Sequence, residues 1–338
     1  MKKISYAEEE WKMGNSLLQK GLFRIDVHQH LVPEVFRSLL DSIGISGGAG
    51  EKFAPWDEHT TLAMMDIHGI QTSVLSYVIC GIKIRDHAFL RRLCRESNEY
   101  LGELLRKYPG RFGGFALLPL PDIEGALEEI RYALDVLKLD GVGMHSNMGG
   151  IYPGDSRFEA IFDELNRRKA VVHLHPNDTP ESHDLRPQWP PYIVEFMFET
   201  TRAVANLIYS GTMERYPDVS IILSHAGGAV PYLAWRLTRG EITIPSLSEA
   251  APVGVLNYLL HFYYDTAMAS NPITFGSLTK LVDFSRIVFG TDYPYMKDQS
   301  VGIFLKEIEN YPGFDQKAKS AILRDNALGL FPHFNKNT

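Results

Sequence analysis

The chain has 338 residues, of which 45% are hydrophobic and 22% are charged, and its formal net charge is −7 at pH 7. This length and composition are typical of a globular protein with a sizeable core, folded as one large domain or two ordinary ones. The acidic balance leaves no electrostatic footprint for nucleic acid or an anionic membrane, so we expect neither as a partner.

We expect no secretion signal in the N-terminal residues. Residues 1–21, MKKISYAEEEWKMGNSLLQKG, lack an apolar core and a small-residue cleavage site. No stretch of the chain approaches the run of about 18 apolar residues that spans a membrane. The two cysteines, Cys80 and Cys94, do not form a C-x-x-C pair. We therefore expect a reduced, cytoplasmic protein with an extension at residues 1–21 and one domain at residues 22–338.

Short apolar runs alternate with longer amphipathic segments after the extension. Eight runs predict strands, at residues 23–28, 72–77, 112–118, 141–146, 170–175, 219–225, 261–266 and 286–292. Helical spacing lies between them, for example at residues 86–108, 123–138 and 155–169, with Asp122 and Asp155 as N-caps. Repeated alternation at this length predicts an α/β fold, a (β/α)8 TIM barrel, with a doubly wound sheet as the competing fold.

Two longer connections interrupt this alternation. Residues 44–58 are rich in glycine, and residues 176–191 contain five prolines. Long connections without regular structure often carry function, so we expect both to form loops or lids on the functional rim of the barrel.

The run RIDVHQH places two histidines at the end of the first predicted strand. Residues i and i+2 of a strand point to the same side, so His28 and His30 share a face, about 7 Å apart along the backbone. Both rings can then converge on one ion. The pair alone also fits a polar strand end that faces water. Residues at the other strand ends are needed to distinguish this possibility from a metal site.

Ionisable residues also lie at the ends of other predicted strands, where a barrel gathers its functional groups. They are His145, His175, His225, Asp265 and Asp292. Three neutral imidazoles and one carboxylate suit a borderline divalent cation such as Zn²⁺. His173 shares the face of His175 and fits the barrel interior equally well.

Four motifs carry a resemblance to a known family: RIDVHQH, VVHLHP, LSHAGGAVPYLAWR and RIVFGTDYPY. They resemble the amidohydrolase superfamily, in the branch of aminocarboxymuconate-semialdehyde decarboxylase and the salicylate- and resorcylate-type decarboxylases. Residues 108–122 and 141–176 resemble the same branch, 6-methylsalicylate decarboxylase in particular. The resemblance covers nearly all of residues 23–331, and it implies a distorted (β/α)8 barrel of the metal-dependent hydrolase type with one metal ion.

The resemblance also implies roles for individual residues. It places the metal ligands on His28, His30, His175 and Asp292. The catalytic histidine falls on His225, and Arg236 falls where relatives carry an arginine that can reach the substrate carboxylate, sometimes across a dimer interface. We therefore expect a homodimer. The chain departs from the family at His145, at His173, and in lacking the strand-end lysine that bridges two metal ions in other members, which favours a single ion.

The expected function is metal-dependent, oxygen-independent decarboxylation of an aromatic or muconate-type carboxylic acid, such as a salicylate. Loss of CO2 from an aromatic carbon requires protonation of that carbon, and His225 and Asp292 are both candidate proton donors. Zn²⁺ is the first expectation for the metal and Mn²⁺ the alternative. Arg236, Arg85 and His145 are candidate substrate-binding residues for this small carboxylic acid.

Two other functions fit the same residues. The ligand set could activate water for hydrolysis of a lactone, amide or ester, with His225 or Asp292 as the general base. A catalytically silent barrel could serve as a binding module, although the intact ligand set speaks against this function.

Overall fold

The computed structural model describes residues 24–178 and 189–337. Eight parallel strands form one sheet in the order β1-β4-β5-β6-β7-β8-β9-β10. They are β1 Arg24–His30, β4 Ile70–Ser76, β5 Phe112–Leu117, β6 Gly141–His145, β7 Val171–His175, β8 Ser220–Leu223, β9 Tyr263–Asp265 and β10 Ile287–Val288. The chain beyond β10 returns to β1, where the His30 N–H donates to the Tyr293 carbonyl at 2.7 Å. This closure confirms the predicted (β/α)8 barrel and excludes the doubly wound sheet.

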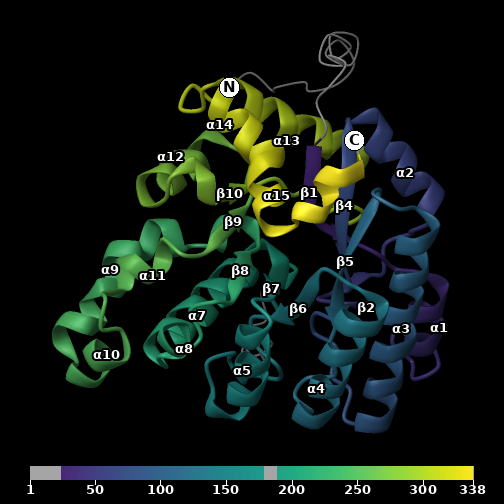
Figure 1. The fold of residues 1–338 in the computed structure, drawn as a ribbon, viewed down its shortest axis with the longest axis horizontal. Coiled ribbons are helices and arrows are strands. Elements are labelled where there is room, and N and C mark those ends of the chain that lie inside the picture. The colour runs from purple at the N-terminus through teal and green to yellow at the C-terminus, as the bar shows by residue number, and fades with distance from the viewer. Residues whose placement is uncertain (1–23, 179–188, 338) are drawn as a thin grey trace.

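Helices follow the strands and surround the barrel (Figure 1). They are α1 Glu34–Asp41, α2 Glu58–Ile67, α3 His87–Lys107, α4 Ile123–Arg131, α5 Glu159–Arg167, α7 Glu195–Tyr209, α8 Thr212–Arg215, α9 Val230–Thr243, α10 Pro245–Ala250, α11 Val255–Leu259, α12 Pro272–Leu281, α13 Asp298–Asn310, α14 Gln316–Ser320 and α15 Asn326–Leu330. In the longest of these, α3, the side chains of Leu90, Leu93, Leu101 and Leu104 are buried at helical spacing. Such stripes form the main core between the strands and the outer helices.

The two predicted N-caps are confirmed. The Asp122 carboxylate accepts the Gly125 N–H at 3.1 Å at the start of α4, and the Asp155 carboxylate accepts the Arg157 N–H at 3.0 Å. Both helices differ from the predicted regular form. The segment after Asp155 begins as a 3₁₀ turn before α5, and α4 continues as a π-helical segment, Tyr132–Leu137.

A second apolar cluster fills the barrel interior at the N-terminal ends of the strands, which we call the lower end. Six strands contribute to it together with the C-terminal segment, and its buried members are Ile25, Val27, Val74, Phe115, Val171, Ile222, Val288, Ala327, Phe331 and Phe334. The rings of Phe115 and Phe331 lie 6.0 Å apart, centroid to centroid. The C-terminal side chains Phe331 and Phe334 form a plug in this end of the barrel. Gly113 leaves room for the plug, because a Cβ there would lie 2.6 Å from Cζ of Phe334. The C-terminal segment therefore closes the N-terminal end of the barrel.

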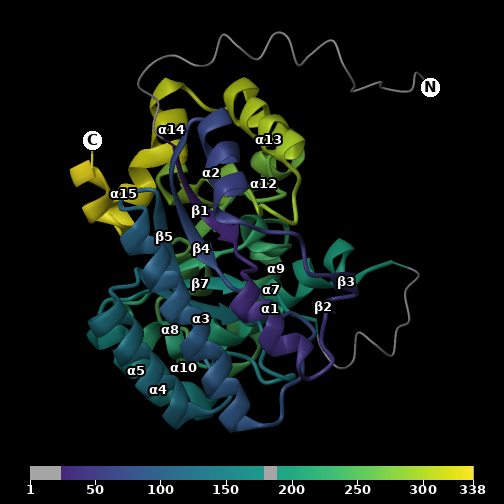
Figure 2. The ribbon, with the colours of Figure 1, turned by 90° about the vertical axis from the view of Figure 1, so that its right-hand side faces the viewer.

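The Gly-rich connection contains regular structure that its sequence did not predict. Within residues 44–58, β2 Gly47–Gly48 and β3 Glu51–Lys52 form a short antiparallel hairpin. Figure 2 shows this hairpin and α15 at opposite sides of the molecule. The predicted extension at residues 1–21, and residues 179–188 of the Pro-rich connection, lie outside the described residues. Within the described ranges, no helix combines the length and apolar character needed to cross a membrane.

Candidate active site

The predicted strand ends meet at the opening of the barrel on the C-terminal side of the strands, which we call the mouth. His28 and His30 share a face of β1, as expected, and their Nε2 atoms lie 3.1 Å apart. Asp292 follows β10 and places Oδ1 at 2.9 Å from Nε2 of His30 and at 3.4 Å from Nε2 of His28. The ring of His175, at the end of β7, lies 5.0 Å from that of His30. All four side chains are buried, so their charges and lone pairs must be satisfied locally.

Hydrogen bonds to the outer ring nitrogens orient the three imidazoles. Nδ1 of His28 lies 2.7 Å from Oδ2 of Asp265, and Nδ1 of His175 donates to the Pro176 carbonyl at 2.8 Å. Nδ1 of His30 lies 3.0 Å from Oγ and 3.3 Å from the carbonyl oxygen of Ser76. Acceptors at Nδ1 place the proton there and leave the Nε2 lone pair free.

The Nε2 atoms of His28 and His30 and the Asp292 carboxylate therefore face each other, with the His175 ring beside them. This donor set is chemically suited to a divalent cation, since neutral imidazoles and a carboxylate are its usual ligands and such orienting hydrogen bonds accompany metal-bound histidines. The residues present thus fit the single metal ion that the sequence led us to expect.

The charges of the site follow the same logic. Burial alone would lower the pKa of His28, but the Asp265 and Asp292 carboxylates outweigh it and raise that pKa to about 10. Burial lowers the pKa of His175 well below its usual value. A proton on His28 thus supplies the positive charge that two buried carboxylates require. A bound cation would supply the same charge and displace that proton, because a ligand imidazole must be neutral.

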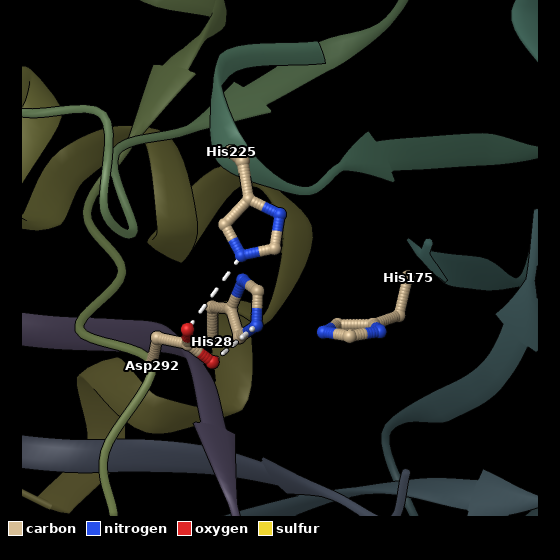
Figure 3. Close-up of side chains that lie close together, drawn as sticks. All are labelled: His28, His175, His225 and Asp292. Carbon is tan, nitrogen blue, oxygen red and sulfur yellow. Dashed lines mark ion pairs between the residues drawn. The ribbon is translucent and has the colours of Figure 1, made fainter. Parts of the chain in front are cut away.

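His225 joins this group from the turn after β8. Ligand atoms of His28, His175, His225 and Asp292 lie within 4.8 Å of one another, and Figure 3 shows the four side chains converging. Nε2 of His225 lies 3.6 Å from Oδ2 of Asp292. Both ring nitrogens of His225 are buried, and neither has a hydrogen-bond partner among the residues that the structure describes. The imidazole is therefore available to substrate or to a proton in a way that the other three rings are not.

The backbone at the mouth is strained. His225 has a φ of 55°, Ala226 of 56° and Asp292 of 64°, a region that costs a non-glycine residue roughly 1–3 kcal/mol. Gly227 and Gly228 continue the turn with φ of 74° and 63°. A Cβ at Gly228 would lie 2.2 Å from the Met197 carbonyl oxygen, so this turn also needs glycine for space. Strain that persists at two neighbouring chain segments is typical of a functional site.

A cavity of about 750 Å³ opens beside these side chains. His30, His175, His225 and Asp292 lie in its wall, which is otherwise largely apolar. The hairpin β2–β3 contributes Lys52, and the segment before α13 contributes Lys297. Neither lysine is predicted as a site residue by the sequence motifs. Lys297 could have been found by reading onward from the strand end at Asp292, whereas nothing in the sequence places Lys52 over the mouth.

The three predicted substrate-binding residues lie outside this wall. Among the described residues that line the cavity, Arg85, Arg236 and His145 are not present. Arg236 is exposed on α9 and Arg85 is exposed before α3. His145 ends β6, where its Nε2 accepts the Ile79 N–H at 3.4 Å, and its ring lies 6.3 Å from that of His175. A single copy of the chain therefore does not bring these three groups to the cavity surface.

Cys80 and His173 flank the converging ligands. Sγ of Cys80 lies in the cavity wall, 3.5 Å from Nδ1 of His175 and 3.1 Å from the Pro176 carbonyl oxygen. His173 lies beneath the site, stacked on Phe115 with ring centroids 5.2 Å apart. Burial and the neighbouring His28 lower the pKa of His173 to about 3, so this ring is neutral. His173 therefore lies in the barrel interior, a position that its sequence allowed.

Comparison with known proteins agrees with this geometry. The family described as Amidohydrolase matches residues 25–333. The decarboxylase yanB of Aspergillus niger is 35% identical over 92% of this chain and 88% of its own length. The 6-methylsalicylic acid decarboxylase acuB of Aspergillus aculeatus is 32% identical, over 93% of this chain and 97% of its own.

A solved structure shares the fold. The 5-carboxyvanillate decarboxylase of Novosphingobium aromaticivorans, complexed with manganese and 4-hydroxy-3-methoxy-5-nitrobenzoic acid, superposes with a TM-score of 0.82 at 22% identity, over 93% of this chain and 97% of that one. The resemblance drawn from the four sequence motifs is confirmed, and the relatives named above are decarboxylases. This chain belongs to the amidohydrolase family.

Proposed function

We propose that this chain is a metal-dependent, non-oxidative decarboxylase of a salicylate-like aromatic carboxylic acid. The observation that carries the proposal is the convergence of the His28, His30 and His175 rings and the Asp292 carboxylate beside a largely apolar cavity. His28, His30, His175 and Asp292 would hold one divalent cation. Zn²⁺ is the first candidate and Mn²⁺ the second, because neutral imidazole and carboxylate ligands suit either ion.

A cation bound here would supply Lewis acidity that holds the substrate carboxylate with its ortho hydroxyl and stabilises developing negative charge. His225 would carry the proton. Its ring nitrogens lack partners, whereas Asp292 is already engaged by His28 and His30. Delivery of that proton to the ring carbon forms a C–H bond, the C–C bond to the carboxylate then breaks, and its electron pair restores the aromatic ring as CO2 leaves.

The cavity supports an aromatic substrate. Its wall includes Phe53, Val78, Phe196 and Met296, which offer apolar contact to a ring, and the 6-methylsalicylic acid decarboxylase at 32% identity acts on a substrate of this kind. Lys52 and Lys297 are the lysines that we assign to a second anionic or hydroxyl group of the substrate. Such contacts orient the substrate so that its carboxylate-bearing carbon faces His225.

We further propose a homodimer that packs through α9. Tyr232 and Trp235 on this helix are 84% and 74% exposed, and Arg236 lies beside them. Large exposed aromatic side chains near an arginine are typical of the centre of a protein interface. In such a dimer Arg236 could reach the partner's cavity, a role it cannot fill within its own chain. The free cysteines Cys80 and Cys94 are consistent with a reducing, cytoplasmic location. We also propose one domain at residues 22–338.

The test of the reaction is run in D2O with a panel of salicylates, resorcylates and lactones. A decarboxylase releases CO2 and leaves one deuterium on the carbon that carried the carboxylate, because that carbon is protonated from solvent-exchanged His225. A hydrolase would instead place solvent oxygen in an acid product and release no CO2. Metal-loaded protein that turns over lactones but none of the aromatic acids would contradict the proposal.

A further inference from the structure

Asp265 lies directly beneath the converging ligands, at the end of β9, and is fully buried. We infer that Asp265 is a positioning residue that holds the ligand His28 and the proton donor His225 in one fixed arrangement. The inference rests on the proposed function for its effect on rate, but its effect on metal binding does not depend on the reaction.

Both oxygens of Asp265 are engaged. Oδ2 lies 2.7 Å from Nδ1 of His28, and Oδ1 accepts the backbone N–H of His225 at 2.8 Å and that of Ala267 at 3.1 Å. Nε2 of His173 lies 3.5 Å from Oδ2 on the far side. The carboxylate is also not part of the cavity wall. Asp265, His28 and His173 could by spacing alone be taken as a second metal group, but both oxygens of Asp265 already accept hydrogen bonds.

The hydrogen bonds to Asp265 have different effects on His28 and His225. His28 receives from Asp265 the acceptor that keeps the proton on Nδ1 and so leaves Nε2 as a lone pair for a metal ion. His225 receives an acceptor for its backbone N–H at the point where φ turns to 55°. A non-glycine residue keeps this conformation only when its surroundings enforce it. One carboxylate therefore sets the direction of a ligand lone pair and the position of the neighbouring imidazole.

A carboxylate is needed because both of its oxygens accept. In Asp265→Asn one oxygen becomes an NH2 group, which donates. If the NH2 group faces His28, it favours the tautomer with the proton on Nε2, which cannot bind a metal. If it faces His225, it opposes the backbone N–H and the turn loses its anchor. Either orientation breaks one of the two links, although the shape of the side chain is unchanged.

Asp26 offers a matched control. It is also fully buried, and it accepts the backbone N–H of His28 at 3.0 Å and the Thr291 hydroxyl at 2.6 Å. It also accepts the Gln29 side chain at 2.9 Å. Within the described residues it has no hydrogen bond to His225. Asp26→Asn thus disturbs a buried carboxylate beside the same ligand but leaves both the His28 ring and the His225 turn with their Asp265 bonds.

The experiment titrates Zn²⁺ into the metal-free full chain and its two variants, and measures kcat at saturating Zn²⁺. Removal of a group that orients a metal-bound histidine typically costs about 10- to 100-fold in metal affinity or activity. For Asp265→Asn we expect Zn²⁺ binding weaker by about that factor, and kcat at saturating Zn²⁺ below that of Asp26→Asn with little change in KM. Zn²⁺ affinity and kcat equal to those of Asp26→Asn overturn the inference.

A second measurement needs no variant that must fold. The ¹⁵N shifts of the histidine rings in the Zn²⁺-loaded wild-type chain, with each ring assigned by through-bond correlation to its own backbone, report which nitrogen of His28 carries the proton. We expect a hydrogen-bonded proton on Nδ1; a proton on Nε2 overturns the inference. Neither the Zn²⁺ titration nor this spectrum involves substrate, so a failed decarboxylation assay would sink the proposed function while these two results still judge Asp265.

Discussion

The two ends of the barrel interior are built from the same strands but solve opposite problems. On β1, Ile25 and Val27 point into the apolar cluster at the lower end, where the C-terminal Phe331 completes the packing. Further along the same strand, His28 and His30 point into the polar mouth. The parallel pairing of β1 with β4 is irregular between Asp26 and Gln29, at the point where the strand changes from one role to the other.

The difference separates stability from function. The lower end contains close-packed aromatic and branched side chains, which stabilise the fold by burying apolar surface. The mouth contains buried carboxylates and imidazoles, strained backbone at His225 and Asp292, and ring nitrogens without partners. Such features cost stability, and proteins retain them where chemistry requires them. Substitutions at the mouth should therefore lower metal content or kcat, whereas substitutions at the lower end should lower the free energy of unfolding.

Loss of the metal ligands should have the largest effect. We expect the purified chain to carry about one divalent ion. His30→Ala and Asp292→Ala should each lose most of this metal, and with it the activity, because each removes one of the four proposed donors. Elemental analysis after gel filtration measures the metal. His145→Ala is the matched control, because it removes a strand-end imidazole that is not one of the four proposed ligands, and it should keep the metal. Full metal content in both ligand variants would exclude this site.

Loss of the proton donor should be the next largest effect. His225→Ala should retain its metal and its fold, because within residues 24–178 and 189–337 the ring nitrogens make no hydrogen bond. It should lose at least roughly 100-fold in kcat, the usual contribution of a general acid or base. Steady-state kinetics and elemental analysis on the same preparation test both parts. Loss of metal would make His225 a ligand instead, and intact activity would transfer the proton to another group, with Asp292 the next candidate.

The plug at the lower end should give the reverse result. Phe331 is 1% exposed, so Phe331→Ala should lower the free energy of unfolding by about 3–5 kcal/mol through lost burial and a cavity. The activity of the folded fraction should be unchanged. Urea unfolding monitors the first effect, with Ile67→Ala on exposed α2 as the control that stays within about 0.5 kcal/mol. A large fall in kcat without a fall in stability would break the separation between the two ends.

Arg236 should have the smallest effect, and it tests whether one chain completes the mouth. If α9 forms a dimer interface, Arg236→Ala should raise KM by roughly fivefold, the worth of a charge contact of about 1 kcal/mol, with kcat little changed. Light scattering at micromolar concentration gives the oligomeric state. A stable monomer would confine the functional mouth to a single chain, and Lys52→Ala and Lys297→Ala would then be the variants expected to raise KM.

Much of the mouth was predictable because strand periodicity and barrel topology are local and regular. The alternation of side chains placed His28 and His30 on one face, and the parallel arrangement placed the ends of β1, β7 and β8 together with Asp292 at one rim. The apolar run before each of these residues identified the strand that carries it. The sites that depend on a loop crossing to another part of the molecule were not predictable, as Lys52 illustrates.

The sequence by itself determined the eight strands and the residue types available at their ends, because these follow from patterns within single segments, whereas closure of the strands into a barrel is a contact between the two ends of the sheet. Only the tertiary structure decided how those residues are used. It placed the Asp265 carboxylate against His28 and the His225 backbone, left Arg236 exposed on α9, and put Phe331 in the lower end of the barrel. These are contacts between segments far apart in the chain, set by packing and hydrogen-bond geometry in three dimensions, which no local pattern records.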